Sequence, residues 1–459
     1  MAHDLAIVLA AGKGTRMRSS RPKVVHKIAG RSMLGHVLTA VNSAQSADRD
    51  LRCAVVVSAG EAGTAVGAEA RRYIETAETF VQAEQRGTGD AVLAARDALG
   101  ANPETVFVLF GDTPLITGQI LTEMRSALDD GADVAVLAFD AENPTGYGRV
   151  VTDESGAVTG IVEEKDATPD QRAIHLCNSG VMAFRIGELA ALFDRITANN
   201  AQGEYYLTDA IALARAVGLD VQVVTCDERA VLGVNDRQQL AVAERLYQDR
   251  ARRRAMVEGA TLIAPETVWF SADTQLGTDV LVEPNVIFGP GVQVADTATI
   301  RANSYLEGAS VGPGCIIGPF ARLRPGADLG VDVRIGNFVE VKNVTMADGS
   351  KANHLSYLGD GTVGRGANVG AGTIFCNYDG FNKHRTEVGD GAFIGSNSAL
   401  VAPVRIGTGA FVGSGSVISK DVADDALAIA RAPQEVREDW ARRFRERGER
   451  LKKAAKAKG

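Results

Sequence analysis

The sequence has few of the features that mark secreted, zinc-structured or membrane-spanning proteins. Its five cysteines are widely spaced and form no CxxC pair, so neither a disulfide framework nor a structural zinc site is predicted. No run of about 18 apolar residues occurs, and no membrane span is expected. The opening residues, MAHDLAIVLAAGKG, have no basic leader and indicate a core strand rather than a signal peptide. We therefore expect a cytoplasmic protein.

An excess of positive charge is also missing. The formal net charge is -8, and charged residues make up 23% of the 459 residues. This balance argues against a general nucleic-acid-binding protein, and the length predicts two or three domains. Basic residues gather only in 435–459, where ten Lys/Arg stand against five Asp/Glu. That segment fits either a contact with an anion or a solvated helix that fades into disorder.

An aliphatic residue recurs at every sixth position in two stretches of the second half. The positions are Val311, Ile317, Leu323, Leu329, Ile335 and Val341, and then Val388, Ile394, Leu400, Ile406, Val412 and Ile418. This period is typical of a parallel β-helix, in which each hexad supplies a short strand and a turn. Residues 268–418 thus predict roughly eight coils. The pattern lapses at 342–358 and 375–386, which we expect to be loop insertions.

Strand-like and helix-like segments alternate over 1–230. Strands are expected at 5–9, 54–57, 79–83, 106–110 and 134–139, and helices at 33–45, 62–73 and 88–99. This order predicts a Rossmann-like α/β domain with a largely parallel sheet covered on both faces. We place this domain at 1–235 and the β-helix domain, with its basic tail, at 259–459. A helix over 236–258 is expected to link them.

Two short segments of the first half suit a nucleotide and a metal ion. The glycine-rich loop 9–17 matches neither GxxxxGK[ST] nor GxGxxG, but its small residues let backbone N–H groups approach phosphate oxygens. Arg16 within the loop and Lys23 beyond it add positive charge. Asp112 follows a predicted strand and offers an oxygen ligand suited to Mg²⁺, although an aspartate there also serves as a turn or N-cap residue.

These segments, in their order, resemble the sugar nucleotidyltransferases, also called pyrophosphorylases, over residues 5–235. The matching blocks are Leu9–Met17, Pro22-Lys23, Gln82–Thr88, Gly111-Asp112, Thr145–Arg149, Glu163, Asn178, Gly203–Asp209 and Gly233–Asn235. The resemblance implies that a sugar-1-phosphate oxygen attacks the α-phosphorus of a nucleoside triphosphate and releases pyrophosphate. Members that use N-acetylglucosamine usually have tyrosine where this chain has Phe110.

The same resemblance assigns roles to residues of the first half. Arg16 and Lys23 would stabilise the triphosphate and the leaving pyrophosphate, and Asp112 and Asn235 would hold Mg²⁺. The site for UTP and UDP-N-acetylglucosamine would comprise Leu9, Ala10, Ala11, Gly12, Lys23, Gln82, Gly87, Thr88, Phe110, Gly111, Asp112, Gly148, Glu163, Asn178 and Asn235. In this set Gln82, Gly87 and Thr88 would read the base, and Gly148, Glu163 and Asn178 would hold the sugar.

His354 lies inside the first lapse of the hexad pattern. A neutral imidazole can take a proton from an amine during acylation, although a histidine on such a loop can also be a plain surface residue. The second half resembles the hexapeptide-repeat acyltransferases, whose β-helix is left-handed. The blocks that carry this resemblance are Gly318–Ala327, Gly336–Glu340, His354–Asp360, Gly370–Thr373 and Cys376–Gly380.

Nearly the whole chain resembles the bifunctional bacterial N-acetylglucosamine-1-phosphate uridyltransferase / glucosamine-1-phosphate acetyltransferase family. The resemblance implies that His354 deprotonates the amine of glucosamine-1-phosphate, with Glu340 as either its orienter or a surface carboxylate. Glucosamine-1-phosphate would be bound by Arg324, Lys342, Tyr357 and Asn368. Acetyl-CoA would be bound by Ala371, Asn377, Tyr378, Ser396, Ser414 and Arg431.

The resemblance also implies a homotrimer that shares the acetyltransferase site between subunits. N-acetylglucosamine-1-phosphate and UTP would then give UDP-N-acetylglucosamine for cell-wall and surface-polysaccharide synthesis. Two alternatives stay open at this point. One is a single-activity nucleotidyltransferase whose β-helix is structural or regulatory, and the other is a non-catalytic trimeric scaffold.

Overall fold

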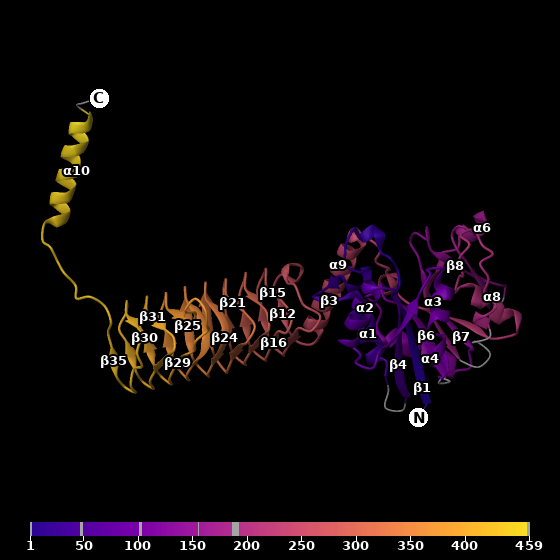
Figure 1. The fold of residues 1–459 in the computed structure, drawn as a ribbon, viewed down its shortest axis with the longest axis horizontal. Coiled ribbons are helices and arrows are strands. Elements are labelled where there is room, and N and C mark those ends of the chain that lie inside the picture. Colours follow the sequence, from indigo (N-terminus) through magenta and orange to yellow (C-terminus); the bar gives the residue numbers. More distant parts are fainter. Residues whose placement is uncertain (1, 46–48, 101–102, 155, 186–191, 457–459) are drawn as a thin grey trace. The chain divides into compact units, whose positions relative to one another are not determined.

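The computed structural model describes residues 2–45, 49–100, 103–154, 156–185 and 192–456. The chain forms two compact units (Figure 1). Unit 1 comprises Met1–Val257 and Trp269–Thr274, and unit 2 comprises Glu258–Val268 and Gln275–Gly459. The long helix α9 (Arg237–Val257) is part of unit 1. Among the described residues, no helix is both long and apolar enough to cross a membrane.

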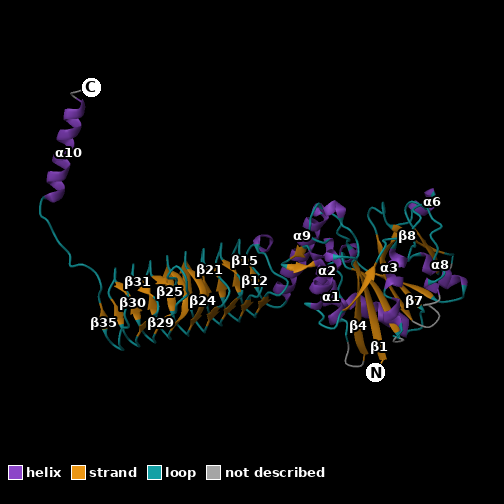
Figure 2. Cartoon of the chain, viewed as in Figure 1, coloured by secondary structure: helices purple, strands orange, loops and turns teal. Residues whose placement is uncertain are grey.

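A twisted sheet forms the centre of unit 1 (Figure 2). Its order is β11-β7-β10-β6-β1-β4-β5. These strands are β1 (Ala2–Leu9), β4 (Arg49–Ser58), β5 (Glu78–Gln82), β6 (Thr105–Phe110), β7 (Val134–Asp140), β10 (Leu176–Arg185) and β11 (Val221–Thr225). A hairpin of β8 (Gly148–Thr152) and β9 (Val158–Val162) joins at β10, and β2 (Lys27–Ile28) pairs with β3 (Arg31–Ser32) apart from the sheet.

Helices cover both faces of this sheet. The faces are separated by alternation along the strands, because Ala6 and Val8 of β1 pack into one core while Leu5 and Ile7 pack into the other. The first core includes α1 (Met33–Ser43), α2 (Glu61–Arg71) and α5 (Gly118–Asp129), and the second includes α3 (Thr88–Ala94), α4 (Arg96–Leu99) and α8 (Asp209–Ala216). Short helical turns complete the unit: Thr15–Met17, Lys23–Val25, α6 (Pro169–Arg172) and Glu228–Val231.

The predicted α/β domain is confirmed, with two differences in detail. The helix expected over 88–99 is divided at Ala95 into α3 and α4. The sheet is less parallel than expected, because β10 runs antiparallel to both β6 and β7. The sequence did not predict β10, because polar residues at Asn178 and beyond interrupt the apolar run of this strand. The strand has a bulge at that point.

Unit 2 is a parallel β-helix built from short strands that stack coil upon coil. One sheet contains β12 (Thr261–Leu262), β14 (Leu281–Val282), β17 (Thr299–Ile300), β20 (Ile316–Ile317), β23 (Arg334–Asn337), β25 (Lys351–His354), β27 (Asn368–Val369), β30 (Phe393–Ile394), β33 (Phe411–Val412) and β35 (Leu427–Ala428). Its ten described strands exceed the roughly eight coils expected, because β12 and β35 extend the stack beyond residues 268–418.

The remaining strands of unit 2 form the other faces of the coils. They are β13 (Gln275–Leu276), β15 (Ile287–Phe288), β16 (Gln293–Val294), β18 (Tyr305–Leu306), β19 (Ala309–Val311), β21 (Arg322–Leu323), β22 (Ala327–Leu329), β24 (Glu340–Met346), β26 (Tyr357–Val363), β28 (Ile374–Cys376), β29 (Thr386–Val388), β31 (Ala399–Val401), β32 (Val404–Ile406) and β34 (Val417–Ile418). A short turn, Pro265–Thr267, and helix α10 (Trp440–Lys456) complete the unit. All twelve aliphatic residues of the two hexad stretches are buried in its interior.

The prediction of a loop insertion at 342–358 is wrong. Strands β24, β25 and β26 cover most of that segment, and the coil there is continuous. The hexad pattern lapses because this coil is slightly shorter than three hexads. Ile317 pairs with Ile335, three hexads later, but Ile335 pairs with Ala352 rather than with Asn353. The shortened turn keeps the strands stacked while it shifts the sequence period.

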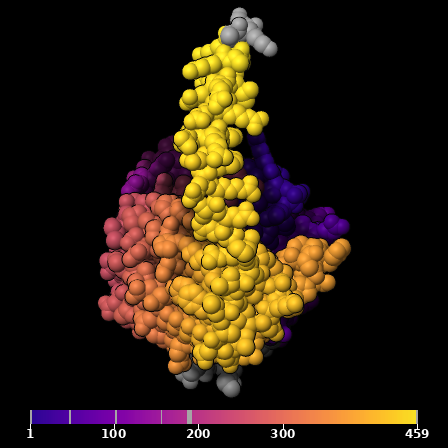
Figure 3. Space-filling model, turned by 90° about the vertical axis from the view of Figure 1, so that its left-hand side faces the viewer, coloured from indigo at the N-terminus to yellow at the C-terminus, as the bar shows by residue number. Residues whose placement is uncertain are grey.

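The second predicted insertion, at 375–386, is confirmed. Phe375 pairs with Leu400, whereas three hexads would lead only to Phe393, so this coil contains extra residues. The additional chain leaves the coil as a loop closed by an antiparallel bridge between Tyr378 and Lys383. It projects from the β-helix as the orange lobe in Figure 3.

Replacing Ile300 by alanine should lower the free energy of unfolding by about 2–5 kcal/mol, because its fully buried side chain would leave a cavity in the β-helix. The matched control is Ile287→Ala, since Ile287 is 41% exposed. Urea unfolding followed by far-UV circular dichroism compares the two midpoints. Equal shifts for the two variants would contradict the assigned core.

Candidate functional site

A cavity opens where the carboxyl ends of β1, β5 and β6 meet. Its volume is about 320 Å³, and it is lined by Leu9, Ala10, Ala11, Gly12, Lys23, Val24, Gln82, Gln85, Gly87, Thr88, Ala91, Phe110, Asp112 and Glu204. Ten of the residues expected around the nucleotide are in this lining. Gly111 lies beside them and donates a backbone hydrogen bond to the carbonyl of Leu9 (2.9 Å). Strand ends of an α/β sheet commonly bind ligands in this way.

The two expected metal ligands meet at Lys23. The Lys23 Nζ donates to the carboxylate of Asp112 and, at 3.1 Å, to Oδ1 of Asn235. The Asp112 carbonyl accepts from the Val234 amide (2.9 Å), which ties the segment bearing Asn235 to the end of β6. Both side-chain oxygens therefore face the position of a single cation, and a carboxylate with an amide oxygen is a donor set that suits Mg²⁺.

Gly14 lets the glycine-rich loop approach Lys23 closely. Its φ is +59°, and a Cβ at this position would lie 2.6 Å from the Cβ of Lys23. Any larger residue would therefore push the loop and the lysine apart. The glycines of this loop allow close backbone packing as well as the phosphate approach expected from the sequence.

The side chain of Gln82 is fixed at the other end of the cavity. It is 5% exposed, and its Nε2 donates to Asp90 Oδ2 (2.9 Å) and to the carbonyl of Gly87 (3.2 Å). An amide held through its nitrogen presents its oxygen as an acceptor, which suits a base with an N–H donor. At Gly87 (φ +124°) a Cβ would lie 2.4 Å from the carbonyl of Tyr205. The close approach of the backbone at Tyr205 therefore requires glycine at position 87.

Gly148, Glu163 and Asn178 form a cluster next to this cavity. Asn178 pairs with Gly148 across β10 and β8, and a Cβ on Gly148 would lie 3.3 Å from the Glu163 carboxylate. Burial raises the pKa of Glu163, which accepts a hydrogen bond from Thr208 Oγ1 (3.2 Å). The ring of Phe110 lies directly under Gly180 of the β10 bulge and connects the cluster to the cavity.

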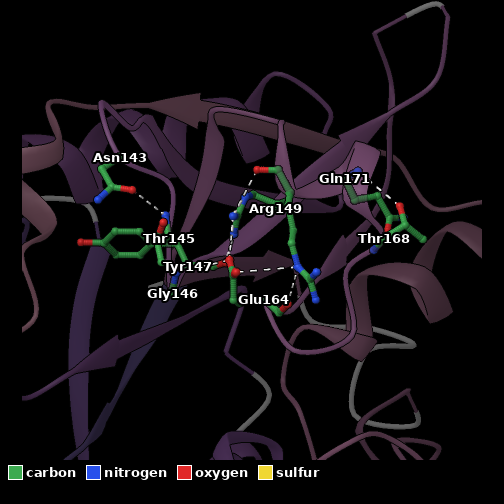
Figure 4. Close-up of polar contacts among 9 residues, drawn as sticks. Asn143, Thr145, Gly146, Tyr147, Arg149, Glu164, Thr168 and Gln171 are labelled. Carbon is green, nitrogen blue, oxygen red and sulfur yellow. Dashed lines mark hydrogen bonds and ion pairs between the residues drawn. The ribbon is translucent and has the colours of Figure 1, made fainter.

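Arg149 of β8 fixes the loop that leads into Gly148 (Figure 4). Arg149 is 2% exposed, donates to the carbonyl of Tyr147, and forms an ion pair with Glu164 at 2.7 Å. Glu164 also accepts from the backbone amide of Gly146 (3.3 Å). The hydrogen bond from Arg149 holds the pKa of Glu164 below its ordinary value. The neighbouring carboxylates Glu163 and Glu164 thus have different functions, since one faces the candidate sugar site and the other supports its loop.

The structure does not place Arg16 in the lining of the cavity. Arg16 lies in the turn Thr15–Met17 with an exposed side chain, whereas Met17 of the same turn is buried. Sequence reasoning missed Val24, Gln85, Ala91 and Glu204. Gln85 donates to the carbonyl of Ala11 and so attaches the segment after β5 to the glycine-rich loop. Gln85 and Glu204 both stand inside blocks that matched the family, which was the available signal.

In unit 2, His354 is oriented by Asn337. The two residues pair across β25 and β23, and the Nδ1 of His354 lies 2.8 Å from Oδ1 of Asn337. Because an amide oxygen accepts, Nδ1 carries the proton and Nε2 has the lone pair needed by a base. A cavity of about 200 Å³ beside them is lined by Arg301, Ile316, Gly318, Pro319, Arg334, Ile335, Gly336, Asn337, Asn353 and His354.

Within one chain Glu340 does not orient His354. Its carboxylate accepts from Arg324 (2.8 Å) and lies 3.8 Å from a guanidinium nitrogen of Arg322. The physical reason is register: Glu340 is in β24 and pairs with Tyr357 of β26, in a different sheet from His354.

Lys342 and Asn377 meet at a buried carboxylate that the sequence analysis did not single out. Asp360 is 6% exposed and accepts from Lys342 (3.4 Å), Asn343 (2.8 Å) and Asn377. Burial alone would raise the pKa of Asp360, but these hydrogen bonds hold it below its ordinary value. Tyr357 lies next to this group, because a Cβ on Gly359 would meet both its hydroxyl and the Asn377 amide.

Several predicted acetyl-CoA residues share one column of the β-helix with His354. Ile335, Ala352, Val369, Ile394 and Val412 pair in successive coils. The residues two positions further on therefore stack at about 4.8 Å intervals. These residues are Asn337, His354, Ala371, Ser396 and Ser414, and the side chain of Arg431 approaches Gly415 at the end of the column.

Other expected residues lie apart from this column within one chain. Asn368 is in the same sheet but stacks between Lys351 and Phe393. Tyr378 is in the insertion, 55% exposed, with the Nζ of Lys383 4.1 Å from its ring centre. The cavity beside His354 includes neither Lys342 nor Arg324 in its lining. The described residues of one chain thus supply the parts of the expected acetyl-transfer site in separate groups.

An α/β unit with a cavity at its strand ends, followed by a hexad β-helix, defines a nucleotidyltransferase joined to a hexapeptide transferase. Residues 6–173 match the MobA-like NTP transferase domain, and residues 385–420 match the bacterial transferase hexapeptide repeats. The bifunctional protein GlmU of Azorhizobium caulinodans is 57% identical over 441 residues, which cover 96% of this chain and 97% of that protein.

Two other relatives have the same name and similar coverage. Bifunctional protein GlmU of Sphingopyxis alaskensis is 52% identical, and that of Agrobacterium fabrum is 49% identical, each over 99% of this chain and 98% of its own length. The chain therefore belongs to the GlmU family. This membership confirms the predicted fold class and the prediction of a bifunctional nucleotidyltransferase and acyltransferase.

Replacing Asp360 by asparagine should reduce the loss of unfolding free energy that occurs as the pH is lowered. The pKa of Asp360 is lowered in the folded state, so its contribution is complete above its unfolded value near 3.8 and is lost as pH falls through the folded pKa. The variant should be less stable at pH 7 by about 1–3 kcal/mol. Urea midpoints between pH 3 and 7 measure both effects, with the exposed Asp328→Asn as control. Parallel curves for wild type and Asp360→Asn would contradict the assignment.

Proposed function

We propose that this chain makes UDP-N-acetylglucosamine from glucosamine-1-phosphate in two steps. Unit 2 transfers an acetyl group from acetyl-CoA to the amine, and unit 1 joins the resulting N-acetylglucosamine-1-phosphate to UTP with release of pyrophosphate. Membership of a bifunctional family supports the pair of activities. The observation that carries the assignment of unit 1 is the convergence of Lys23, Asp112 and Asn235 at the nucleotide-sized cavity.

For uridylyl transfer, we assign charge neutralisation to Lys23. A phosphate oxygen of the sugar phosphate attacks the α-phosphorus of UTP, the bond to the β-phosphate breaks, and pyrophosphate leaves. Lys23 lines the cavity, so its ammonium group would remain within reach of the phosphates when Asp112 and Asn235 bind a metal ion in its place. Asp112 and Asn235 would hold Mg²⁺, which supplies further neutralisation of the phosphates when bound. We keep Arg16 as a phosphate contact, because it belongs to the same loop as Gly12, which lines the cavity.

The same cavity suits the remaining parts of the product. The side-chain oxygen of Gln82, whose nitrogen is already hydrogen-bonded, would accept a hydrogen bond from the N–H of uracil. The backbone of Gly87 and the side chain of Thr88 would enclose the base. The Gly148–Glu163–Asn178 cluster would bind the hydroxyl and acetamido groups of the sugar. Burial raises the pKa of Glu163, so its carboxylate would gain from a hydroxyl donor that replaces the water it has lost.

For acetyl transfer, we assign proton abstraction to Nε2 of His354, with Asn337 positioning the ring. The amine nitrogen attacks the thioester carbonyl, its proton passes to Nε2, the C–S bond breaks, and coenzyme A leaves as a thiol. Arg324, Lys342, Tyr357 and Asn368 would bind glucosamine-1-phosphate. Ala371, Asn377, Tyr378, Ser396, Ser414 and Arg431 would line the acetyl-CoA site, and three of them (Ala371, Ser396 and Ser414) are in the column that contains His354.

We propose a homotrimer, because one chain leaves these groups separate and exposes apolar rows beside them. Phe320 and Phe338 stack at 5.3 Å and are continued by Leu355, with 48%, 56% and 62% exposure. All three have φ between +52° and +56°, a costly conformation for large side chains. Burial of this row against a second copy would offset that cost and bring another chain's residues to His354. The cytoplasm, where acetyl-CoA and UTP are available, is the proposed location.

Asp112→Ala should reduce uridylyl transfer by at least about a thousandfold, since it removes a metal ligand and the partner that positions Lys23. Acetyl transfer should be unchanged, because its residues all lie in unit 2. Pyrophosphate release from UTP and N-acetylglucosamine-1-phosphate, measured across a Mg²⁺ titration, tests this. Retained activity at any Mg²⁺ concentration would rule out the proposed metal position.

His354→Ala should reduce acetyl transfer by about 10²–10⁴-fold and leave uridylyl transfer intact. Free thiol release from acetyl-CoA with glucosamine-1-phosphate measures the first activity. The matched variant is Asn337→Ala, which keeps His354 but removes the side chain that orients its ring. This variant should lower kcat for acetyl transfer and shift the acid limb of the pH profile of that activity. Normal acetyl transfer by His354→Ala would rule out His354 as the base, whereas absence of acetyl transfer by the wild-type protein would favour a single-activity enzyme with a structural β-helix.

A further inference from the structure

Helix α10 (Trp440–Lys456) has a narrow apolar stripe. Trp440, Phe444, Leu451 and Ala455 recur at spacings of 4, 7 and 4 residues, which place them on one face of an α-helix. Trp440, Phe444 and Leu451 are 55%, 63% and 62% exposed, and the two rings stack at 5.1 Å. Every residue of α10 is exposed. The stripe is therefore uncovered by any other described part of the chain.

Positive charge borders this stripe on both sides. The basic residues of α10 are Arg442, Arg443, Arg445, Arg447, Arg450, Lys452, Lys453 and Lys456, against Glu446 and Glu449. At 3.6 residues per turn, Arg443 and Arg450 follow one edge of the stripe and Arg445 and Lys452 follow the other, while Glu449 lies opposite Trp440. The helix is thus strongly cationic in a chain whose net charge is -8.

We propose that α10 docks parallel to an anionic phospholipid surface. Trp440, Phe444 and Leu451 would enter the boundary between headgroups and acyl chains, and the bordering guanidinium and ammonium groups would contact lipid phosphates. An apolar stripe with an aromatic pair, flanked by cations and with its carboxylates on the far side, is the pattern of a helix that lies in a bilayer interface. This inference goes beyond the proposed function and does not depend on it.

The sequence of α10 favours a bilayer over a second copy of the helix. A coiled-coil seam would contain Trp440, Phe444, Arg447, Leu451 and Ala454 at heptad spacing. Arg447 would then stand in the middle of the seam, where a buried unpaired cation is costly. On a lipid surface the same residue reaches a phosphate at the edge of the stripe by extending its side chain.

The ends of α10 are suited to forming a helix once it is bound. Asp439 precedes the first turn and pairs with Arg442 (3.1 Å), while Lys452, Lys453 and Lys456 occupy the end, so charges at both ends complement the helix dipole. An exposed helix of this length is only marginally stable in water. Binding to anionic lipid should therefore increase helicity as well as hold the chain at the surface.

The test is flotation of the full-length protein with vesicles of phosphatidylcholine alone or with 30% phosphatidylglycerol (about the anionic content needed for electrostatic adsorption). Binding to the anionic vesicles should be at least about tenfold stronger, should weaken as salt is raised, and should disappear when 434–459 are deleted. Equal binding to both vesicle types, or binding that survives the deletion, would overturn the proposal.

Two pairs of substitutions with the same change in charge separate oriented docking from simple attraction. Arg443→Gln with Arg450→Gln removes cations that border the stripe and should weaken binding about tenfold or more. Arg442→Gln with Lys453→Gln removes two cations from the far side and should weaken it less than about threefold. Equal losses would overturn the oriented arrangement.

The alternative occupant, another copy of this chain, is tested with the same proteins. Light scattering gives the oligomeric state of the full-length protein and of the 434–459 deletion, and both transferase activities report that the deletion variant is folded. An unchanged oligomer with loss of vesicle binding supports lipid docking. A smaller oligomer without vesicle binding by either protein would show that α10 contacts another subunit and would overturn the proposal.

Discussion

The stacking of each coil of the β-helix on the coil before it is the constraint on which the chemistry of unit 2 depends. A strand must return above its predecessor after about three hexads, or its aliphatic side chain leaves the core. This repetition places Asn337 directly beside His354, although they belong to successive coils. It also aligns Ala371, Ser396 and Ser414 below that pair. A one-residue slip in register would therefore remove the hydrogen bond between Asn337 and His354, the proposed base, and divide the column.

How far the sequence can predict this structure depends on whether a residue's role is local or results from register. Ile317 and Ile335 reveal the β-helix because each repeats the same local requirement for an aliphatic residue. Asn337 gives no such signal, since its partner is defined only by the length of one coil, and that coil falls short of the period. The sequence did not predict strand β10 for a related reason, because the bulge after Asn178 interrupts its apolar pattern.

In unit 1 the corresponding constraint is the common edge of the sheet. β1 and β6 end side by side, so Leu9 and Phe110 pair and the residues beyond them share one cavity. Asp112 and the glycine-rich loop were predictable, because each follows an apolar strand. A place for Asn235 near Asp112 was implied only by the family resemblance, and its contact with Lys23 was not predicted. The intervening chain includes several strands and helices whose paths no local pattern defines.

The cations that we propose as phosphate ligands in the two candidate sites are held in the same physical way. Lys23 is paired with Asp112, Lys342 with Asp360, and Arg324 with Glu340, so each long side chain is ordered by a carboxylate. Ordering a lysine or arginine in advance reduces the entropy lost when a substrate binds. The carboxylate also competes with the phosphate for the cation, which limits affinity for any one anion. Such an arrangement suits an enzyme that must release phosphorylated products, because tight ground-state binding of pyrophosphate or a sugar phosphate would slow turnover.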